Sequence, residues 1–152
     1  MISYGKQHIT KSDIESVTKV LKSNFLTQGP QVPLFEGSIK KIIKSNYCIA
    51  TSSATSALHI SCLALGLKKG DIFWTSPITF AASANCALYC EAIVDFVDID
   101  PLTFNMSTKA LEEKLILAKK KNKLPKIVMP VHLGGLSCDM KLIYKLSKKI
   151  RL

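Results

Sequence analysis

Hydrophobic positions recur with helical spacing over the first third of the chain. An apolar stripe follows residues 12–15, whose Ser-x-x-Glu spacing is that of a capping box, and it predicts a helix that ends near Ser23. After a polar loop, Pro33 suits the first turn of a second helix. The pattern therefore predicts two leading helices over residues 11–45.

Short apolar runs then alternate with amphipathic segments. This alternation predicts an α/β fold with a mainly parallel sheet that helices cover on both faces. No linker or repeat divides the chain, so the pattern predicts part of one domain over residues 1–152. A strand would be due after the last helix, and the pattern therefore indicates an incomplete domain. We expect strands at 47–50, 72–76, 93–97 and 127–131, and helices at 54–65, 81–90 and 107–120, with a last helix, capped by Ser137 or Asp139, that ends near Ile150.

The formal net charge of +10 invites a nucleic-acid hypothesis. Arg151 is the only arginine, however, whereas specific contacts to bases and phosphates favour arginine. The lysine cluster over residues 119–123 falls at an expected helix end, where cations suit the helix dipole. We expect a solvated basic face and no nucleic-acid partner, and the charge remains compatible with anionic substrates.

The five cysteines form no Cys-x-x-Cys pair, and their odd number does not suit a disulfide framework. We expect buried, reduced thiols and no metal site, because Cys86 and Cys90 would need further ligands. Residues 1–6 lack the apolar core of a secretory signal, and no apolar run is long enough to span a membrane. These features predict a cytoplasmic protein without a membrane partner.

Candidate binding residues lie in the turns that follow the expected strands, where open α/β sheets bind ligands. The hydroxylated turn 51–58 begins a helix, and its backbone N–H groups could hold an anion or form an ordinary N-cap. Phe80 could stack on a flat ring or belong to the core. The acids in residues 95–100 could bind a cation or cap turns, and His132 could contact a substrate. Glycine-rich dinucleotide and P-loop motifs are absent.

The order and spacing of these motifs are more specific than any one of them. They resemble the DegT/DnrJ/EryC1/StrS family of sugar aminotransferases over essentially the whole chain. The resemblance implies the front part of the large domain of fold type I, the aspartate-aminotransferase fold, with pyridoxal 5'-phosphate as cofactor and a homodimer as the working form. The motifs are Tyr4-Gly5-Lys6-Gln7, Leu26-Thr27-Gln28-Gly29-Pro30, Ser53-Ala54-Thr55-Ser56-Ala57-Leu58-His59, Ser76-Pro77-Ile78-Thr79-Phe80-Ala81-Ala82, Phe96-Val97-Asp98-Ile99-Asp100 and Pro130-Val131-His132-Leu133-Gly134-Gly135.

The resemblance also implies roles for individual residues. Ala54 and Thr55 would hold the cofactor phosphate, and Phe80 would lie on the pyridine ring. A sugar-nucleotide pocket would be lined by Tyr4, by the stretch from Asn24 to Thr27 and by Ala54. Within that stretch Leu26 and Thr27 match the family directly, whereas Asn24 and Phe25 match only in position. The implied reaction transfers an amino group, with glutamate as the usual donor, to a UDP-linked 4-keto-6-deoxy sugar.

The family's catalytic machinery lies beyond Leu152. The acid that pairs with the pyridinium nitrogen and the lysine that carries the cofactor both belong to later motifs, so we expect no catalytic residue and no turnover from residues 1–152 alone. Two alternatives remain open from the sequence. One is a family member that acts as a sugar dehydratase with histidine in place of the lysine, and the other is a non-catalytic remnant or interaction module. The exact sugar also stays open.

Overall fold

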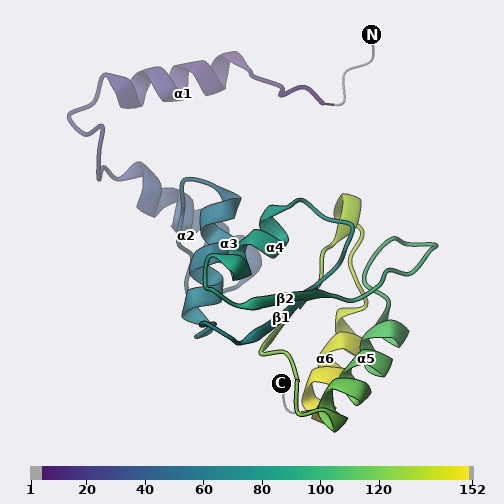
Figure 1. Cartoon of the computed structure of the whole chain (residues 1–152). Coiled ribbons are helices and arrows are strands. Elements are labelled where there is room, and N and C mark those ends of the chain that lie inside the picture. Colours follow the sequence, from purple (N-terminus) through teal and green to yellow (C-terminus); the bar gives the residue numbers. More distant parts are fainter. Residues whose placement is uncertain (1–4, 151–152) are drawn as a thin grey trace. The chain divides into compact units, whose positions relative to one another are not determined.

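A computed structural model describes residues 5–150 of the chain (Figure 1). The chain forms two compact units, Met1–Ala50 and Thr51–Leu152. Each unit is described by itself below.

The first unit contains helices α1 (Lys11–Leu21) and α2 (Gln31–Ile43). Its capping box is formed by Thr10 and Asp13, not by residues 12–15 as the sequence predicted. The Asp13 N–H donates to the Thr10 hydroxyl at 3.3 Å, and the Thr10 N–H donates to the Asp13 carboxylate at 2.7 Å. Residues 10–13 and residues 12–15 both have the spacing of a capping box. Thr10 is the N-cap because its backbone is extended and the helix begins at Lys11.

The strand expected over residues 47–50 is not formed. The Ala50 N–H donates instead to the Glu36 carboxylate at 2.7 Å, and Tyr47 and Ile49 are 86% and 76% exposed. A strand needs a neighbouring strand to accept its backbone hydrogen bonds, whereas the described part of this unit, residues 5–50, holds helices only. Apolar composition alone therefore misled the prediction at this position.

The second unit follows the predicted alternation, with strands shorter than expected. Its elements are α3 (Ala54–Ala64), β1 (Ile72–Thr75), α4 (Ala82–Leu88), β2 (Ile93–Phe96), α5 (Thr108–Lys120), β3 (Ile127–Met129), the 3-10 turn η1 (Leu133–Gly135) and α6 (Met140–Ile150).

The three strands form a parallel sheet in the order β2-β1-β3. Successive side chains of β1 point to opposite faces, so that Phe73 enters one apolar core with α3 and α4 while Trp74 enters another with α5 and α6. Figure 1 shows α3 and α4 on one side of the strands and α5 and α6 on the other. The α/β fold class predicted from the sequence is confirmed.

Helix ends in this unit use the expected residues. Ser53 and Ser107 cap α3 and α5, and Asp139, rather than Ser137, caps the start of α6 by accepting the Leu142 N–H at 3.0 Å. These caps fix the residue at which each helix begins.

Candidate functional site

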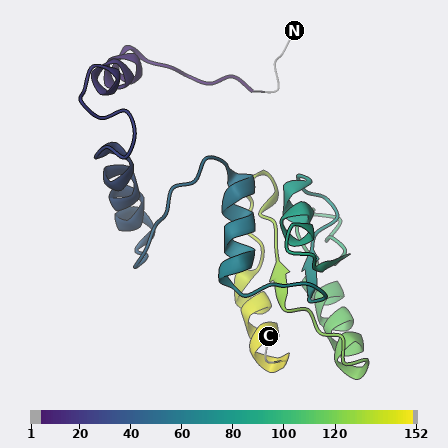
Figure 2. The same ribbon diagram turned by 60° about the vertical axis from the view of Figure 1, so that its left-hand side comes forward.

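The carboxyl ends of the strands lie at one edge of the sheet. Thr75 at the end of β1 is in register with Phe96 of β2 and with Met129 of β3. The helices run back antiparallel to the strands, and Figure 2 shows β3 (lime) pointing toward the end at which α3 begins. The structure thus confirms that residues 53–55, Phe80 and His132 share this carboxyl edge.

The start of α3 presents free backbone donors at the carboxyl edge. Ser53 has an extended backbone, and its hydroxyl and carbonyl oxygens accept the N–H groups of Ser56 and Ala57 at 3.1 and 3.0 Å. Within the described residues, the N–H groups of Ala54 and Thr55 make no such bond. The first turn contains no acidic residue that would neutralise the helix dipole, so this end suits an anion.

Phe80 follows β1 and is 78% exposed, which contradicts the alternative that it is a core residue. Its turn is held in place, because its carbonyl oxygen accepts the Ser83 N–H at 2.9 Å and the hydroxyls of Thr79 and Ser83 lie 2.7 Å apart. An exposed aromatic ring at the ligand-binding edge of a sheet has the shape and polarisability to cover a flat heteroaromatic group.

Two hydroxyl side chains mark the end of the central strand. Thr75 donates its hydroxyl to the carbonyl oxygen of Met129 at 3.0 Å and so ties β1 to β3. Ser76 is fully buried, and its hydroxyl finds no hydrogen-bond partner among the described atoms. A buried hydroxyl without a hydrogen-bond partner is uncommon and destabilises the fold. The Ser76 hydroxyl is such a group, and it lies beside the candidate site.

The loop after β3 is held by a residue that the sequence analysis missed, which lies in the connection between β2 and α5. Asn105 is 4% exposed, and its side chain binds the backbone of Leu133, the first residue of η1, and of Leu136, which follows η1. His132 precedes η1, is exposed, and accepts the Cys138 N–H on Nδ1 at 3.1 Å. The sequence offers no signal for Asn105 beyond its place in a polar turn before a helix cap, because its partners lie about 30 residues away.

The acids in β2 and in the turn after it have partners within the fold. Asp100 accepts the N–H groups of Leu102 and Thr103, and these backbone bonds lower its pKa. Burial raises the pKa of Asp95, but the hydrogen bonds from Lys114 and from the Phe96 N–H, together with the charge of Lys114, outweigh burial, and the pKa is lowered. Asp100 therefore caps a turn, as one of the two alternatives proposed, whereas Asp95 pairs with a lysine, which the sequence did not predict. Within residues 5–150, no group of three or more His, Cys, Asp or Glu side chains could hold a metal ion.

The cysteines are free thiols, as predicted, and four of the five are buried. Cys62 and Cys86 join α3 to α4, with their sulfur atoms 3.7 Å apart. Burial raises the pKa of Cys62 to about 12, so this thiol is neutral at physiological pH and behaves as a small apolar side chain.

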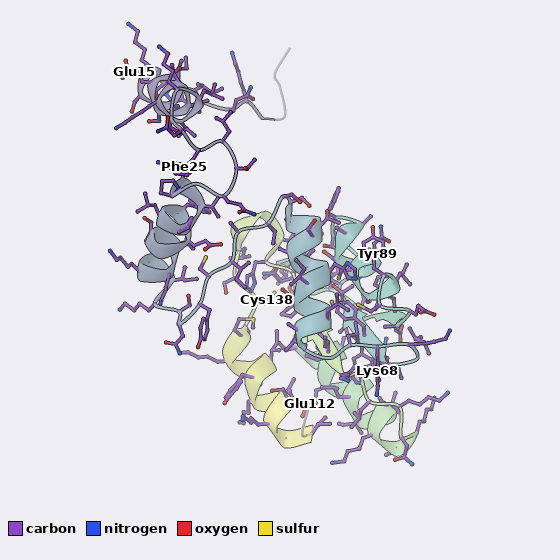
Figure 3. All side chains as sticks on the ribbon, turned by 90° about the vertical axis from the view of Figure 1, so that its left-hand side faces the viewer. Glu15, Phe25, Lys68, Tyr89, Glu112 and Cys138 are labelled. Carbon is purple, nitrogen blue, oxygen red and sulfur yellow. The ribbon has the colours of Figure 1, made fainter. Side chains whose placement is uncertain are left out.

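Apart from Ala54, the residues assigned to the sugar-nucleotide pocket by resemblance belong to the first unit. The stretch from Asn24 to Thr27 belongs to the loop between α1 and α2, where Phe25 and Leu26 are 59% and 67% exposed (Figure 3). A Cβ on Gly29 would lie 2.9 Å from the Phe25 Cβ, which explains the glycine at this turn. Tyr4 lies outside the described residues, and the structure gives no position for it.

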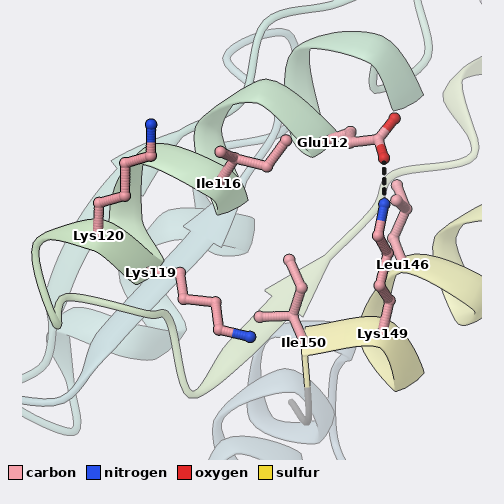
Figure 4. A pocket seen from close by; sticks show the side chains of 7 residues that line it. All are labelled: Glu112, Ile116, Lys119, Lys120, Leu146, Lys149 and Ile150. Atoms are coloured by element: carbon pink, nitrogen blue, oxygen red, sulfur yellow. Dashed lines mark hydrogen bonds and ion pairs between the residues drawn. The ribbon is translucent and has the colours of Figure 1, made fainter.

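A groove between α5 and α6 lies away from the carboxyl edge. Apolar side chains form its floor and lysines form its rim, with Lys149 paired to Glu112 at 3.0 Å (Figure 4). It is formed near the C-terminal ends of both helices, which lie at the opposite edge of the sheet. The lysine cluster at residues 119–121 is therefore remote from the candidate site.

The model of the DegT/DnrJ/EryC1/StrS aminotransferase family matches residues 7–152 of this chain. The chain belongs to this family. Its members are sugar aminotransferases, and the cofactor of the family is pyridoxal phosphate, since solved neighbours include PLP and PMP forms.

Two curated relatives illustrate the match. The chain is 42% identical over 149 residues to the UDP-4-amino-4,6-dideoxy-N-acetyl-beta-L-altrosamine transaminase of Campylobacter jejuni strain 81-176, covering 98% of this chain and 38% of the relative. It is 35% identical over 147 residues to the spore coat polysaccharide biosynthesis protein SpsC of Bacillus subtilis, covering 97% of this chain and 36% of that protein. The chain thus spans less than two fifths of the length of these relatives.

Solved structures share the fold. Helicobacter pylori PseC, described as an aminotransferase involved in the biosynthesis of pseudoaminic acid, superimposes with a TM-score of 0.85 at 31% identity over 99% of this chain and 39% of that one. The PMP form of the putative sugar aminotransferase Spr1654 from Streptococcus pneumoniae gives a TM-score of 0.87 at 26% identity, covering 99% of this chain and 36% of that one. The predicted fold type is therefore shown. No helix within residues 5–150 is long and apolar enough to cross a membrane.

Proposed function

We propose that the protein to which this chain belongs transfers an amino group from glutamate to the 4-keto carbon of a UDP-linked 4-keto-6-deoxy-N-acetyl sugar, in the pathway to pseudaminic acid. The observation that carries the proposal is the 42% identity, across 98% of the chain, to the Campylobacter jejuni transaminase whose name describes a 4-amino-4,6-dideoxy sugar nucleotide. The protein works as a homodimer, as the family resemblance implies, and it is cytoplasmic, as the sequence predicts.

The carboxyl edge fits the cofactor that the family uses. Pyridoxal phosphate supplies the electron sink for breaking bonds at the amino carbon. The N–H groups of Ala54 and Thr55 bind its phosphate, because they are unused within the described residues and stand at the positive end of α3. The exposed ring of Phe80 covers one face of the heteroaromatic ring. These groups bind and orient the cofactor, and neither takes part in proton transfer.

The sugar nucleotide is recognised by the remaining residues that the resemblance assigned. The family resemblance assigns this role to Tyr4, to the stretch from Asn24 to Thr27 and to Ala54. The exposed apolar surface of Phe25 and Leu26 supports this assignment, because aromatic and aliphatic side chains exposed on a loop are available for a nucleotide base or an N-acetyl group.

The catalytic lysine is supplied from outside residues 1–152. No lysine of this chain stands in the family's lysine motif, and the most obvious cluster, residues 119–121, lies at the opposite edge of the sheet. Residues 1–152 by themselves therefore bind the cofactor without transferring an amino group.

A chimeric enzyme tests the proposal. Residues 1–152 replace the matching segment of the Campylobacter jejuni transaminase, and the chimera is incubated with cofactor, glutamate and the UDP-linked 4-keto sugar. Mass spectrometry should detect the amino sugar from the chimera and none from residues 1–152 alone. A folded, cofactor-loaded chimera without product would contradict the assigned reaction, and turnover by residues 1–152 alone would contradict the assigned source of the catalytic group.

A further inference from the structure

The orientation of the His132 ring is set by one backbone hydrogen bond. Nδ1 accepts the N–H of Cys138 at 3.1 Å, and a ring nitrogen that accepts such a bond carries no proton. The neutral imidazole must then carry its proton on Nε2. Because the His132 side chain is exposed, this Nε2–H is accessible to a ligand at the carboxyl edge.

The backbone around His132 is held at both ends. The thiol of Cys138 donates to the carbonyl oxygen of Val131 at 3.2 Å, which closes the base of the loop. Asn105 accepts the Leu133 N–H on Oδ1 at 3.0 Å and donates Nδ2 to the Leu136 carbonyl oxygen at 2.9 Å. The 3-10 turn between Leu133 and Leu136 is thus bracketed by one side chain.

This bracket comes from a distant and buried residue. Asn105 is 28 residues before Leu133 in the chain and belongs to the connection between β2 and α5. Burying an amide side chain costs free energy unless its donor and its acceptor both find partners, and here both do. Surface loops are usually mobile, so a loop fixed in this way at the ligand-binding edge indicates a group whose position matters.

We propose that His132 is a ligand-binding residue, which donates its Nε2–H to an oxygen atom of the molecule bound at the carboxyl edge of the sheet. The acceptor is an oxygen of the cofactor or of the sugar nucleotide, and the two sources share this chemistry. The identity of the bound molecule rests on the proposed function. The position and tautomer of the donor rest on the contacts of Cys138 and Asn105.

Two substitutions separate the two ring nitrogens. The amide nitrogen of His132→Gln reaches about as far as Nε2 and keeps a donor there, whereas the amide of His132→Asn can replace only Nδ1. His132→Ala removes both. His59→Gln is the matched control, since His59 lies within α3 and contacts Tyr89 rather than the loop.

The purified chain is titrated with pyridoxamine 5'-phosphate in one arm and with UDP-N-acetylglucosamine in the other. We expect the Asn and Ala variants to bind roughly tenfold more weakly in at least one arm, and the Gln variant to bind within about threefold of the unchanged protein. The affected arm identifies the source of the oxygen. Nitrogen-15 spectra of the histidine rings should show an unprotonated Nδ1 and an Nε2–H signal that shifts when that ligand is added.

The possible results separate this inference from the proposed function. If the unchanged protein binds neither probe, the proposed function fails and the inference fails with it. If it binds them and all three His132 variants bind equally well, only the inference is overturned. A protonated Nδ1, or an Asn variant that binds better than the Gln variant, would also overturn it.

Discussion

The phosphate site at α3 can be tested by removing a single backbone N–H. In Ala54→Pro the donor disappears, while the helix can retain its geometry because proline is favoured at the first helical position. The residue before a proline must be extended, and Ser53 already is, with φ −160° and ψ 160°. We therefore expect the free energy of unfolding to change by no more than about 1 kcal/mol.

The expected loss of affinity follows from the lost bond. A hydrogen bond to a charged group contributes about 1.5–3 kcal/mol, which corresponds to a roughly 10- to 150-fold weaker complex. The assay is a calorimetric titration with pyridoxamine 5'-phosphate, which has no aldehyde and so does not react with surface lysines. The matched control is Thr108→Pro, which removes the same group from α5, where Ser107 is also extended.

The two proline variants should therefore differ. Unchanged affinity in a well-folded Ala54→Pro protein would show that the start of α3 does not hold the phosphate. Equal losses in both proline variants would assign the effect to altered folding rather than to the deleted donor.

Three further predictions concern residues around the site and the loop that leads into β1. Phe80→Ala should weaken pyridoxamine 5'-phosphate binding by very roughly 1–3 kcal/mol through lost stacking and burial, and unchanged binding would mean that the ring does not cover the cofactor. Ser76→Ala should raise the free energy of unfolding by about 1 kcal/mol, because it removes a buried hydroxyl without a partner; a loss of stability in urea melts would show that the hydroxyl is satisfied. The hydrogen bond from Lys126 lowers the pKa of Asp71 below its usual 3.8, so this carboxylate stabilises the fold above about pH 4 and the contribution disappears as the pH falls through its folded-state pKa. Thermal melts between pH 5 and pH 2 should lose part of their pH dependence in Lys126→Met, and an identical pH profile would argue against the pair.

The hydrophobic periodicity of the sequence was sufficient to predict the helices and strands of the second unit. Its apolar runs, serine caps and the glycine stop after α3 are local signals, and the helices and strands formed within a few residues of the expected positions. Local signals failed where the structure depends on a contact with another residue or strand. The segment from Tyr47 to Ala50 has the composition of a strand but no neighbouring strand. Thr10 caps the first helix, although residues 12–15 have the same capping-box spacing.

The candidate site could be predicted only in part for the same reason. Strand–helix alternation places Phe80 and His132 at one edge, because parallel strands share their carboxyl ends. Residues 53–55 follow no strand, and they lie at this edge because α3 runs antiparallel to the sheet. The exposure of Phe80 and the role of Asn105 depend on tertiary contacts that no sequence window contains. The roles of Ala54 and Thr55 remain predictions that rest on the family resemblance and on the free N–H groups of α3.

The most direct test is an experimental structure of the protein with pyridoxamine 5'-phosphate bound. Our account predicts phosphate oxygens within hydrogen-bond distance of the Ala54 and Thr55 N–H groups, and the pyridine ring against Phe80. A phosphate bound instead by the lysines of the groove between α5 and α6, at the opposite edge of the sheet, would contradict it.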